Sequence, residues 1–420
     1  MVTFLSASDI GKLIQPGMLV YVQGSIGQPT SLLQGLDGVL QECAGLHFVS
    51  VLTPGLNGFP VGKIATDTKL TTFFDYKELR KSLSPGDIEF VPSHYSDIPK
   101  RLKEMPQFDL ALIQLSRPDG EGACSTGLSA DFVPDILSRC NTVVGELNSQ
   151  MPRLRDAPSI PLDRLDYAVM ADYQLVQTGL VTTNPTLERI AEHATELIRD
   201  GDTLQFGVGR IPPVVLSKLT NKNDLGLHTG LVTPAVRPLI ERGVMNGALK
   251  TIDTGKHVAG AAVGDDAFYA WLRGQPAFSI RPVSYTHSAQ TLATIDNFVA
   301  INSAIEVDLF GQANSEMANG RQVSGSGGLV DFIRGARLSR GGRAIICLQA
   351  AGDKGGRSNI VLKLTSVVSV CRTDMDYVVT EYGIAALAGK SVAEKASALI
   401  AIAAPQFRDR LQVEWNVLQA

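Results

Sequence analysis

Two glycine-bearing segments combine residue types that suit the binding of an anion. The motif GVGRI at 207–211 follows the apolar run 203–206, and two prolines open the helix-like segment after it. The motif HTG at 228–230 follows a second apolar run, 225–228, and Pro234 opens the next helix-like segment. Glycine lets the backbone approach a ligand closely, and a helix N-terminus presents free N–H groups. A phosphate-rich or carboxylate ligand is the first hypothesis, and a plain connecting turn is the alternative.

Other residues with chemical potential lie farther along the chain. The segment VSGSGG at 323–328 offers backbone N–H groups to an oxyanion or a phosphate, or forms a tight turn before a helix. Lys354, within GDKGGR, either holds a phosphate or is a solvated loop lysine. Glu146 and Glu316 are carboxylates near turns, where carboxylates commonly act as caps or surface groups. His228 lies either at an active-site edge or in a place where backbone hydrogen bonds hold it.

Composition and motif searches exclude several classes of function. The six histidines lack metal-ligand spacing, the five cysteines form no C-x-x-C pair, and no G-x-S-x-G elbow occurs. A formal net charge of −4 with scattered basic residues argues against nucleic-acid binding. We see no signal peptide and no apolar run of the roughly 18 residues that a membrane helix needs. We therefore expect a cytoplasmic protein without a metal site.

Strand-like and helix-like segments alternate along the chain and must position these residues. Examples are the apolar strand 110–115, the helix 98–104 and a helix that Asn184 caps and Pro185 begins. This alternation predicts an α/β fold of mainly parallel sheets with helices on both faces. Near the C-terminus, we expect a strand at 367–371 and a helix at 391–403 that Pro405 ends.

The length and the internal similarity indicate two domains. At about 100–200 residues per domain, 420 residues suggest two or three. Similar glycine turns at 17–29 and 201–212 hint at two related α/β domains that face each other. We place the boundary between residues 1–182 and 183–420, with a ligand site at the domain interface.

Six motifs in one order carry a resemblance to a known family. They are LQFGVGRIPPVVL, LGLHTG…PLIERGV, AINSAIEVDLFGQANSE, VSGSGGLVDFIRGARLSRGGRAII, YVVTEYGIAALAGKS and IAAPQFRDRL. Their order resembles the acetyl-CoA hydrolase/transferase family, which includes 4-hydroxybutyrate, acetate and propionate CoA-transferases. The resemblance implies two similar open α/β domains with the active site between them. It also implies acyl-CoA and a carboxylate as substrates, no tightly bound cofactor, and assembly into homodimers or homotetramers.

Carried over position by position, the resemblance also implies site residues. The residues implied to contact CoA are Gly207, Val208, Gly209, Arg210, Ile211, Ser324, Gly328 and Lys354. Gly328 is expected near the thioester carbonyl, and the loop that bears Lys354 differs in length among members. The substrate pocket is expected to include Ile26, His228 and Gly230.

One position departs from the family pattern. The family's nucleophile is a glutamate in a motif like H-[ST]-E, which attacks an acyl-CoA and then carries CoA as a glutamyl thioester. Here the third position is Gly230, so the catalytic residue is unknown. The first hypothesis is a CoA-transferase in which glycine opens space for a bulky or dicarboxylic acid. That acid's own carboxylate attacks the thioester, or Glu146 or Glu316 replaces the nucleophile. The alternatives are an acyl-CoA hydrolase, with water in the vacated space, and a non-catalytic acyl-CoA-binding protein.

Overall fold

The computed structural model describes residues 2–36, 43–58, 67–82, 86–179, 182–352 and 355–419. The chain divides into two compact units, neither of which is continuous in sequence. The first unit contains Met1–Gly179, Val258–Thr286 and Val323–Gly327, and the second contains Leu180–His257, His287–Gln322 and Gly328–Ala420. The domain boundary predicted after residue 182 stays a prediction.

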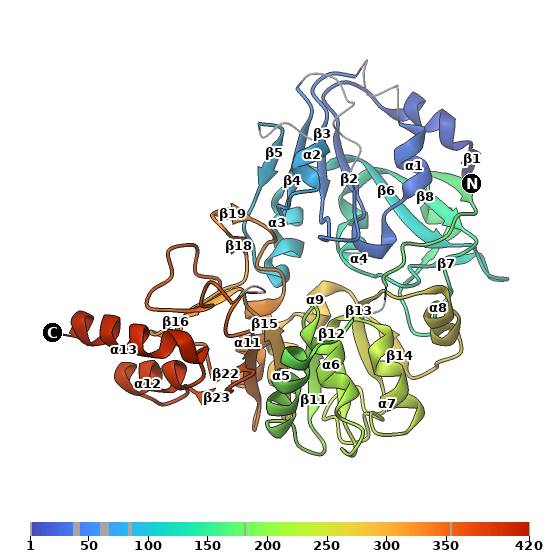
Figure 1. The fold of residues 1–420 in the computed structure, drawn as a ribbon. Coiled ribbons are helices and arrows are strands. Elements are labelled where there is room, and N and C mark those ends of the chain that lie inside the picture. Colours follow the sequence, from blue (N-terminus) through green and yellow to red (C-terminus); the bar gives the residue numbers. More distant parts are fainter. Residues whose placement is uncertain are drawn as a thin grey trace. The chain divides into compact units, whose positions relative to one another are not determined.

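The first unit is built on an eight-stranded sheet (Figure 1). The strand order is β1-β10-β8-β6-β2-β3-β4-β5, and every neighbouring pair is parallel. These strands are β1 (Thr3–Leu5), β2 (Leu19–Val22), β3 (His47–Ser50), β4 (Lys69–Thr72), β5 (Ile88–Phe90), β6 (Phe108–Ser116), β8 (Cys140–Asn148) and β10 (Tyr167–Ala171). A parallel sheet needs both faces covered. Along β2, Val20 and Val22 enter one core cluster and Tyr21 enters another, so both faces are buried.

Short helices and further strands complete the first unit. Its helices are α1 (Thr30–Gly35), α2 (Leu79–Ser82), α3 (Ile98–Glu104), α4 (Val133–Ile136), α8 (Asp266–Arg273) and α9 (Val283–Thr286), with the 3-10 turns η1 (Ala7–Leu13), η2 (Ser25–Gly27), η5 (Tyr95–Asp97), η6 (Leu137–Arg139) and η7 (Leu162–Arg164). Its remaining strands are β7 (Ala123–Ser125), β9 (Ser159–Pro161), β14 (Phe278–Ile280) and all of β13 (His257–Ala262) except its first residue. The predicted helix at 98–104 is confirmed to the residue.

The second unit contains strands in the order β12-β11-β15-β20-β22-β23. They are β11 (Thr203–Phe206), β12 (Gly226–Val232), β15 (Phe298–Ser303), β20 (Arg343–Cys347), β22 (Tyr377–Thr380) and β23 (Gly383–Ala386). Only the last of these pairs, β22 with β23, is antiparallel. The mainly parallel α/β fold predicted from the sequence is therefore confirmed.

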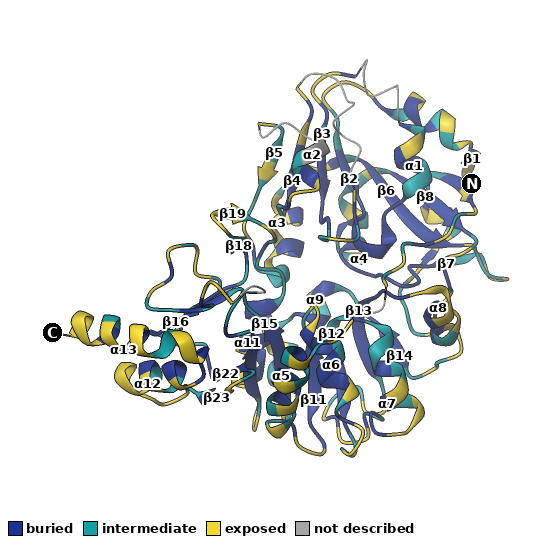
Figure 2. Cartoon of the chain, in the orientation of Figure 1, coloured by how far each residue is buried: buried dark blue, intermediate teal, exposed yellow. Residues whose placement is uncertain are grey.

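Helices cover this second set of strands. They are α5 (Pro185–Glu196), α6 (Ile211–Ser217), η8 (Pro234–Val236), α7 (Arg237–Glu241), α10 (Ala289–Ala293), α11 (Leu329–Leu338), α12 (Val392–Ala401) and α13 (Pro405–Gln419). The predicted start of α5 is confirmed, because the Asn184 side chain accepts a hydrogen bond from the Leu187 amide at 2.9 Å. Short strands add β16 (Glu306–Asp308), β17 (Ala313–Asn314), β18 (Met317–Ala318), β19 (Arg321–Gln322) and β21 (Ile360–Val361). Figure 2 shows buried strands and exposed outer faces on α12 and α13.

Three local predictions were wrong. The turn expected at residues 228–230 does not exist, since β12 continues through Gly230 to Val232. The helix predicted at 391–403 is present as α12, which ends at Ala401, but it is not the last one: Pro405 begins α13, because its fixed φ and missing N–H suit a first turn. Residues 367–371 form no regular strand, and only Val370 makes an isolated bridge, to Ala313. That apolar run lacks a strand partner along its length, so its composition alone was misleading.

Candidate functional site

The turn after β11 is built against the neighbouring strand β15. The Gly207 amide donates a hydrogen bond to the Ile301 carbonyl at 2.9 Å. A Cβ at Gly207 would lie 2.6 Å from Oδ1 of Asn302, so a larger residue would displace the Asn302 side chain. Gly209 has φ +127°, which side-chain-bearing residues rarely adopt. The geometry of this predicted CoA-binding turn therefore favours glycine at both positions.

A reciprocal amide pair lies beneath this turn. Gln205 Nε2 donates to Oδ1 of Asn302 at 3.3 Å, and Asn302 Nδ2 donates to Oε1 of Gln205 at 2.9 Å. Above the pair, Val208 is 65% exposed and Arg210 is also exposed, while Ile211 is buried at the start of α6. The turn therefore exposes the apolar side chain of Val208 and the cationic side chain of Arg210 next to a hydrogen-bonded pair of buried amides.

Gly230, the position implied for a glutamate, is a half-buried residue of β12. A Cβ at Gly230 would lie 2.9 Å from Nε2 of His287 and 3.5 Å from Cε2 of Phe332. The direction that a side chain would take is thus occupied by an imidazole. We expected Gly230 to open space for substrate or water. Along the direction of a side chain at residue 230 that expectation is wrong, because the imidazole of His287 lies there.

The same imidazole lies against Gly328, the N-cap of α11. A Cβ at Gly328 would lie 2.5 Å from Cδ2 and 2.6 Å from Nε2 of His287, and 2.9 Å from Phe332. His287 is 3% exposed, and its ring centroid lies 4.5 Å from that of Phe332. Two predicted site glycines therefore contact one buried histidine, although His287 lies far from both in sequence.

Burial decides the charge of this histidine. Desolvation by burial and, to a smaller extent, the nearby His228 lower the pKa of His287 to about 3. His228 itself is fully buried in β12, edge-to-face with Phe298 at 6.2 Å between ring centroids. At neutral pH, the His287 ring is therefore an uncharged imidazole.

Two of the remaining predicted site residues belong to the first unit, and a third lies outside the described residues. Ser324 is half-buried in the first unit, and its hydroxyl donates to the Gly325 carbonyl at 3.1 Å. Ile26 is also in the first unit, buried in η2 at 2% exposure. Lys354 lies outside the residues that the structure describes. Their predicted roles stay predictions.

Glu146 is a buried carboxylate with both oxygens engaged. It lies in β8 at 0% exposure, and one oxygen accepts the Leu32 amide of α1 at 2.8 Å. The other oxygen accepts the Tyr173 hydroxyl. Burial raises the pKa of Glu146 to about 6, against these hydrogen bonds, which lower it. This arrangement ties α1 to the sheet, and the carboxylate is not presented to solvent.

Glu316 is likewise held by neighbouring side chains. It lies before β18 and is 8% exposed. One oxygen accepts the Ser369 hydroxyl at 2.7 Å, and the other accepts the Gln322 amide at 3.5 Å. These hydrogen bonds connect the hairpin of β18 and β19 to the segment around residue 369.

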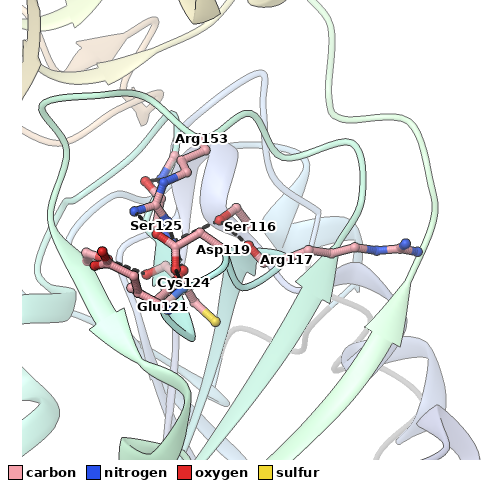
Figure 3. Close-up of polar contacts among 10 residues, drawn as sticks. Ser116, Arg117, Asp119, Glu121, Cys124, Ser125 and Arg153 are labelled. Carbon is pink, nitrogen blue, oxygen red and sulfur yellow. Dashed lines mark hydrogen bonds and ion pairs between the residues drawn. The ribbon is translucent and has the colours of Figure 1, made fainter.

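A polar cluster that the sequence analysis did not select orders the loop after β6 (Figure 3). One oxygen of Asp119 accepts the amides of Glu121 and Ala123 at 3.0 and 2.8 Å, and the other pairs with Arg153 at 2.5 Å. Arg153 also donates to the Ala123 carbonyl at 2.8 Å. Burial raises the pKa of the adjacent Cys124 thiol to about 11, so this thiol stays protonated at neutral pH. The side chains of this cluster form hydrogen bonds with backbone groups of the loop itself.

Two searches of the described residues bear on other kinds of site. Within 2–36, 43–58, 67–82, 86–179, 182–352 and 355–419, no group of three or more histidines, cysteines or acidic residues is placed to hold a metal ion. None of the helices in those same ranges is long and apolar enough to cross a membrane.

Comparisons with known proteins place these features in context. Residues 2–178 match the family model of the acetyl-CoA hydrolase/transferase N-terminal domain, and residues 264–415 match that of the C-terminal domain. The chain is 35% identical to a 4-hydroxybutyrate coenzyme A transferase of Clostridium kluyveri, over 97% of this chain and 95% of the relative. It is 26% identical to an acetyl-CoA hydrolase of Saccharomyces cerevisiae, over 77% of this chain and 70% of the relative.

Solved structures resemble the fold over nearly its whole length. RipA from Yersinia pestis has a TM-score of 0.91 and 30% identity, covering 99% of this chain and 98% of that one. A 4-hydroxybutyrate CoA-transferase from Porphyromonas gingivalis has a TM-score of 0.83 and 29% identity, covering 99% and 97%.

Proposed function

Because the chain belongs to the acetyl-CoA hydrolase/transferase family, we propose that it is a CoA-transferase that moves CoA between an acyl-CoA and a free carboxylic acid. The observation that carries this proposal is the relative named a 4-hydroxybutyrate coenzyme A transferase, which is 35% identical over 97% of this chain. CoA enters as part of a substrate and leaves as part of a product.

The turn at 207–211 is the part of the proposed site that receives CoA. Its backbone is fixed by contacts of Gly207 with β15, and its outward residues are Val208 and Arg210. A guanidinium suits a phosphate, and an exposed valine suits an apolar part of CoA. Contacts of CoA with Ser324, Gly328 and Lys354, and the location of the site between domains, stay predictions.

For the chemistry, we propose that the acceptor's own carboxylate attacks the thioester. Gly230 offers no carboxylate, and the hydrogen bonds of Glu146 and Glu316 favour structural roles for those two groups. Direct attack needs no enzyme nucleophile, because the acceptor brings an ionised oxygen of its own.

The discriminating experiment incubates the full-length enzyme with acetyl-CoA or succinyl-CoA and a panel of mono- and dicarboxylic acids. A new acyl-CoA, detected by mass spectrometry and absent without enzyme or without acceptor, is the expected product. Free CoA without a new acyl-CoA would instead favour the hydrolase function, for which the similarity to a named acetyl-CoA hydrolase is the supporting observation. If neither product forms, a non-catalytic acyl-CoA-binding protein is the remaining alternative.

We also propose a cytoplasmic location and a homo-oligomeric state. All five cysteines are free thiols, as is typical of proteins in a reducing compartment. Subcellular fractionation tests the location. Sedimentation equilibrium tests the oligomer, and a monomer at micromolar concentration would contradict it.

A further inference from the structure

The segment at residues 323–327, which we call the strap, belongs to the first unit although both of its flanks belong to the second. Residues Val323–Gly327 are part of the first unit, whereas His287–Gln322 and Gly328–Ala420 are part of the second. So short a segment stays with the first unit only through specific contacts. Those contacts come from two places in the first sheet, the ends of β4 and β5.

Two glycines seat the strap on the residues that follow β4. A Cβ at Gly325 would lie 2.3 Å from the carbonyl oxygen of Phe73, so a larger residue would have to displace the backbone. Gly327 has φ +51°, and a Cβ there would lie 3.4 Å from Cζ of Phe74. The strap is thus packed closely against Phe73 and Phe74.

Two hydrogen bonds hold the strap on the segment that follows β5. The Ser326 hydroxyl donates to the Ser93 carbonyl at 2.8 Å, and the Tyr95 amide donates to the Gly327 carbonyl at 3.0 Å. The Tyr95 ring lies edge-on to that of Phe74, with ring centroids 6.1 Å apart. Because the first of these bonds comes from a side chain, a substitution can remove it without altering the backbone.

These contacts leave the amides at the end of the strap unused. Ser326, Gly327 and Gly328 are half-buried, and within the described part of the chain their amides donate to no acceptor. The family resemblance implies that Gly328 lies near the thioester carbonyl. One peptide bond joins Gly328 to the strap, so its amide moves when the strap moves. Donors fixed in advance are what the oxygen requires as negative charge develops on it.

We propose that Ser326 is a positioning residue of the transfer reaction, whose bond to the Ser93 carbonyl holds the strap and the Gly328 amide where the thioester carbonyl binds. This inference rests on the proposed function and adds to it a residue that acts through another. A displacement of about 1 Å in a catalytic site can cost about 100-fold in rate. Loss of the Ser326 bond is therefore expected to act on kcat.

The test compares Ser326→Ala with Ser326→Thr in the full-length enzyme. Alanine removes the hydroxyl donor, whereas threonine keeps it. We measure kcat and KM with an acyl-CoA and acceptor pair that the wild type uses, and thermal unfolding gives the Tm of each variant. Ser339→Ala is the matched control, since the Ser339 hydroxyl also donates to a distant carbonyl, that of Ile295 at 2.6 Å, at the C-terminal end of α11.

We expect kcat of Ser326→Ala to fall by about 10- to 100-fold with little change in KM for the acyl-CoA. Ser326→Thr is expected to remain within about threefold of wild-type kcat, because the hydroxyl donor is retained. Ser339→Ala is expected to lower Tm but to keep wild-type kcat.

Three results would overturn the positioning role and leave the proposed function intact. They are wild-type kcat in Ser326→Ala, an equal loss of kcat in Ser326→Thr, and a loss of kcat in Ser339→Ala as large as that in Ser326→Ala. Absence of any transfer by the wild type overturns the proposed function, and this inference with it.

Discussion

Replacing Gly230 by alanine tests the packing on which the site depends. The added methyl would lie 2.9 Å from Nε2 and 3.0 Å from Cε1 of His287, against 3.4–4 Å for ordinary contact, an overlap of about half an ångström. The ring cannot retreat freely, because Phe332 and Gly328 lie against it. Overpacking of this kind costs about 1–3 kcal/mol. The intrinsic effect of replacing a strand glycine has the opposite sign, about 0.5–1 kcal/mol, so a net loss identifies the collision.

The measurement is a double-mutant cycle by differential scanning calorimetry. An overpacking cost of about 2 kcal/mol less the intrinsic gain leaves a net loss of about 1 kcal/mol, so at about 2–4 °C per kcal/mol for 150–250 residues Gly230→Ala should lower Tm by roughly 2–4 °C. In the His287→Ala background the methyl has room, so the same change should raise Tm by about 1–4 °C, a coupling of about 2 kcal/mol. Gly120→Ala is the control, since Gly120 is exposed and its Cβ would meet nothing within 4 Å. Equal losses with and without His287 would refute the reasoning.

Three further predictions concern the supporting structure. Burial raises the pKa of Glu146 from 4.5 to about 6. Between these two pH values the native state keeps a proton on Glu146 that the unfolded state loses. The contribution of this group to the free energy of unfolding therefore falls by about 2 kcal/mol as pH rises from 4.5 to 6 and is then constant. Glu146→Gln should remove that part of the pH dependence of Tm, and an unchanged slope would contradict the assignment. Arg343→Ala should lower the free energy of unfolding by about 3–5 kcal/mol, because it leaves the buried carboxylate of Asp202 without the Arg343 cation. Adding Asp202→Asn should restore part of the loss. Equal Tm for the single and the double variant would count against this prediction. Asp119→Ala should speed hydrogen exchange of the loop amides at residues 121 and 123 with little change in Tm, and unaltered exchange would show that Arg153 suffices to order the loop.

Features that depend on local chain chemistry were predictable from the sequence. The cap at Asn184 follows from a side-chain oxygen placed before Pro185, and the turn around Gly209 follows from a backbone conformation that suits glycine. The parallel α/β fold follows from the alternation of apolar runs with helical segments. The family membership follows from motifs that are contiguous along the chain.

Tertiary structure alone decided how those pieces meet. Gly230 continues a strand rather than forming a turn, because a strand's extent depends on pairing with neighbours that the local sequence does not specify. The imidazole of His287 lies against Gly230 and Gly328 only because the folded second unit brings three distant segments together. The sequence by itself determined the family, the fold class and the two glycine positions. Which side chain occupies the space beside those glycines is a matter of packing between distant segments, and spacing along the chain carries no information about it.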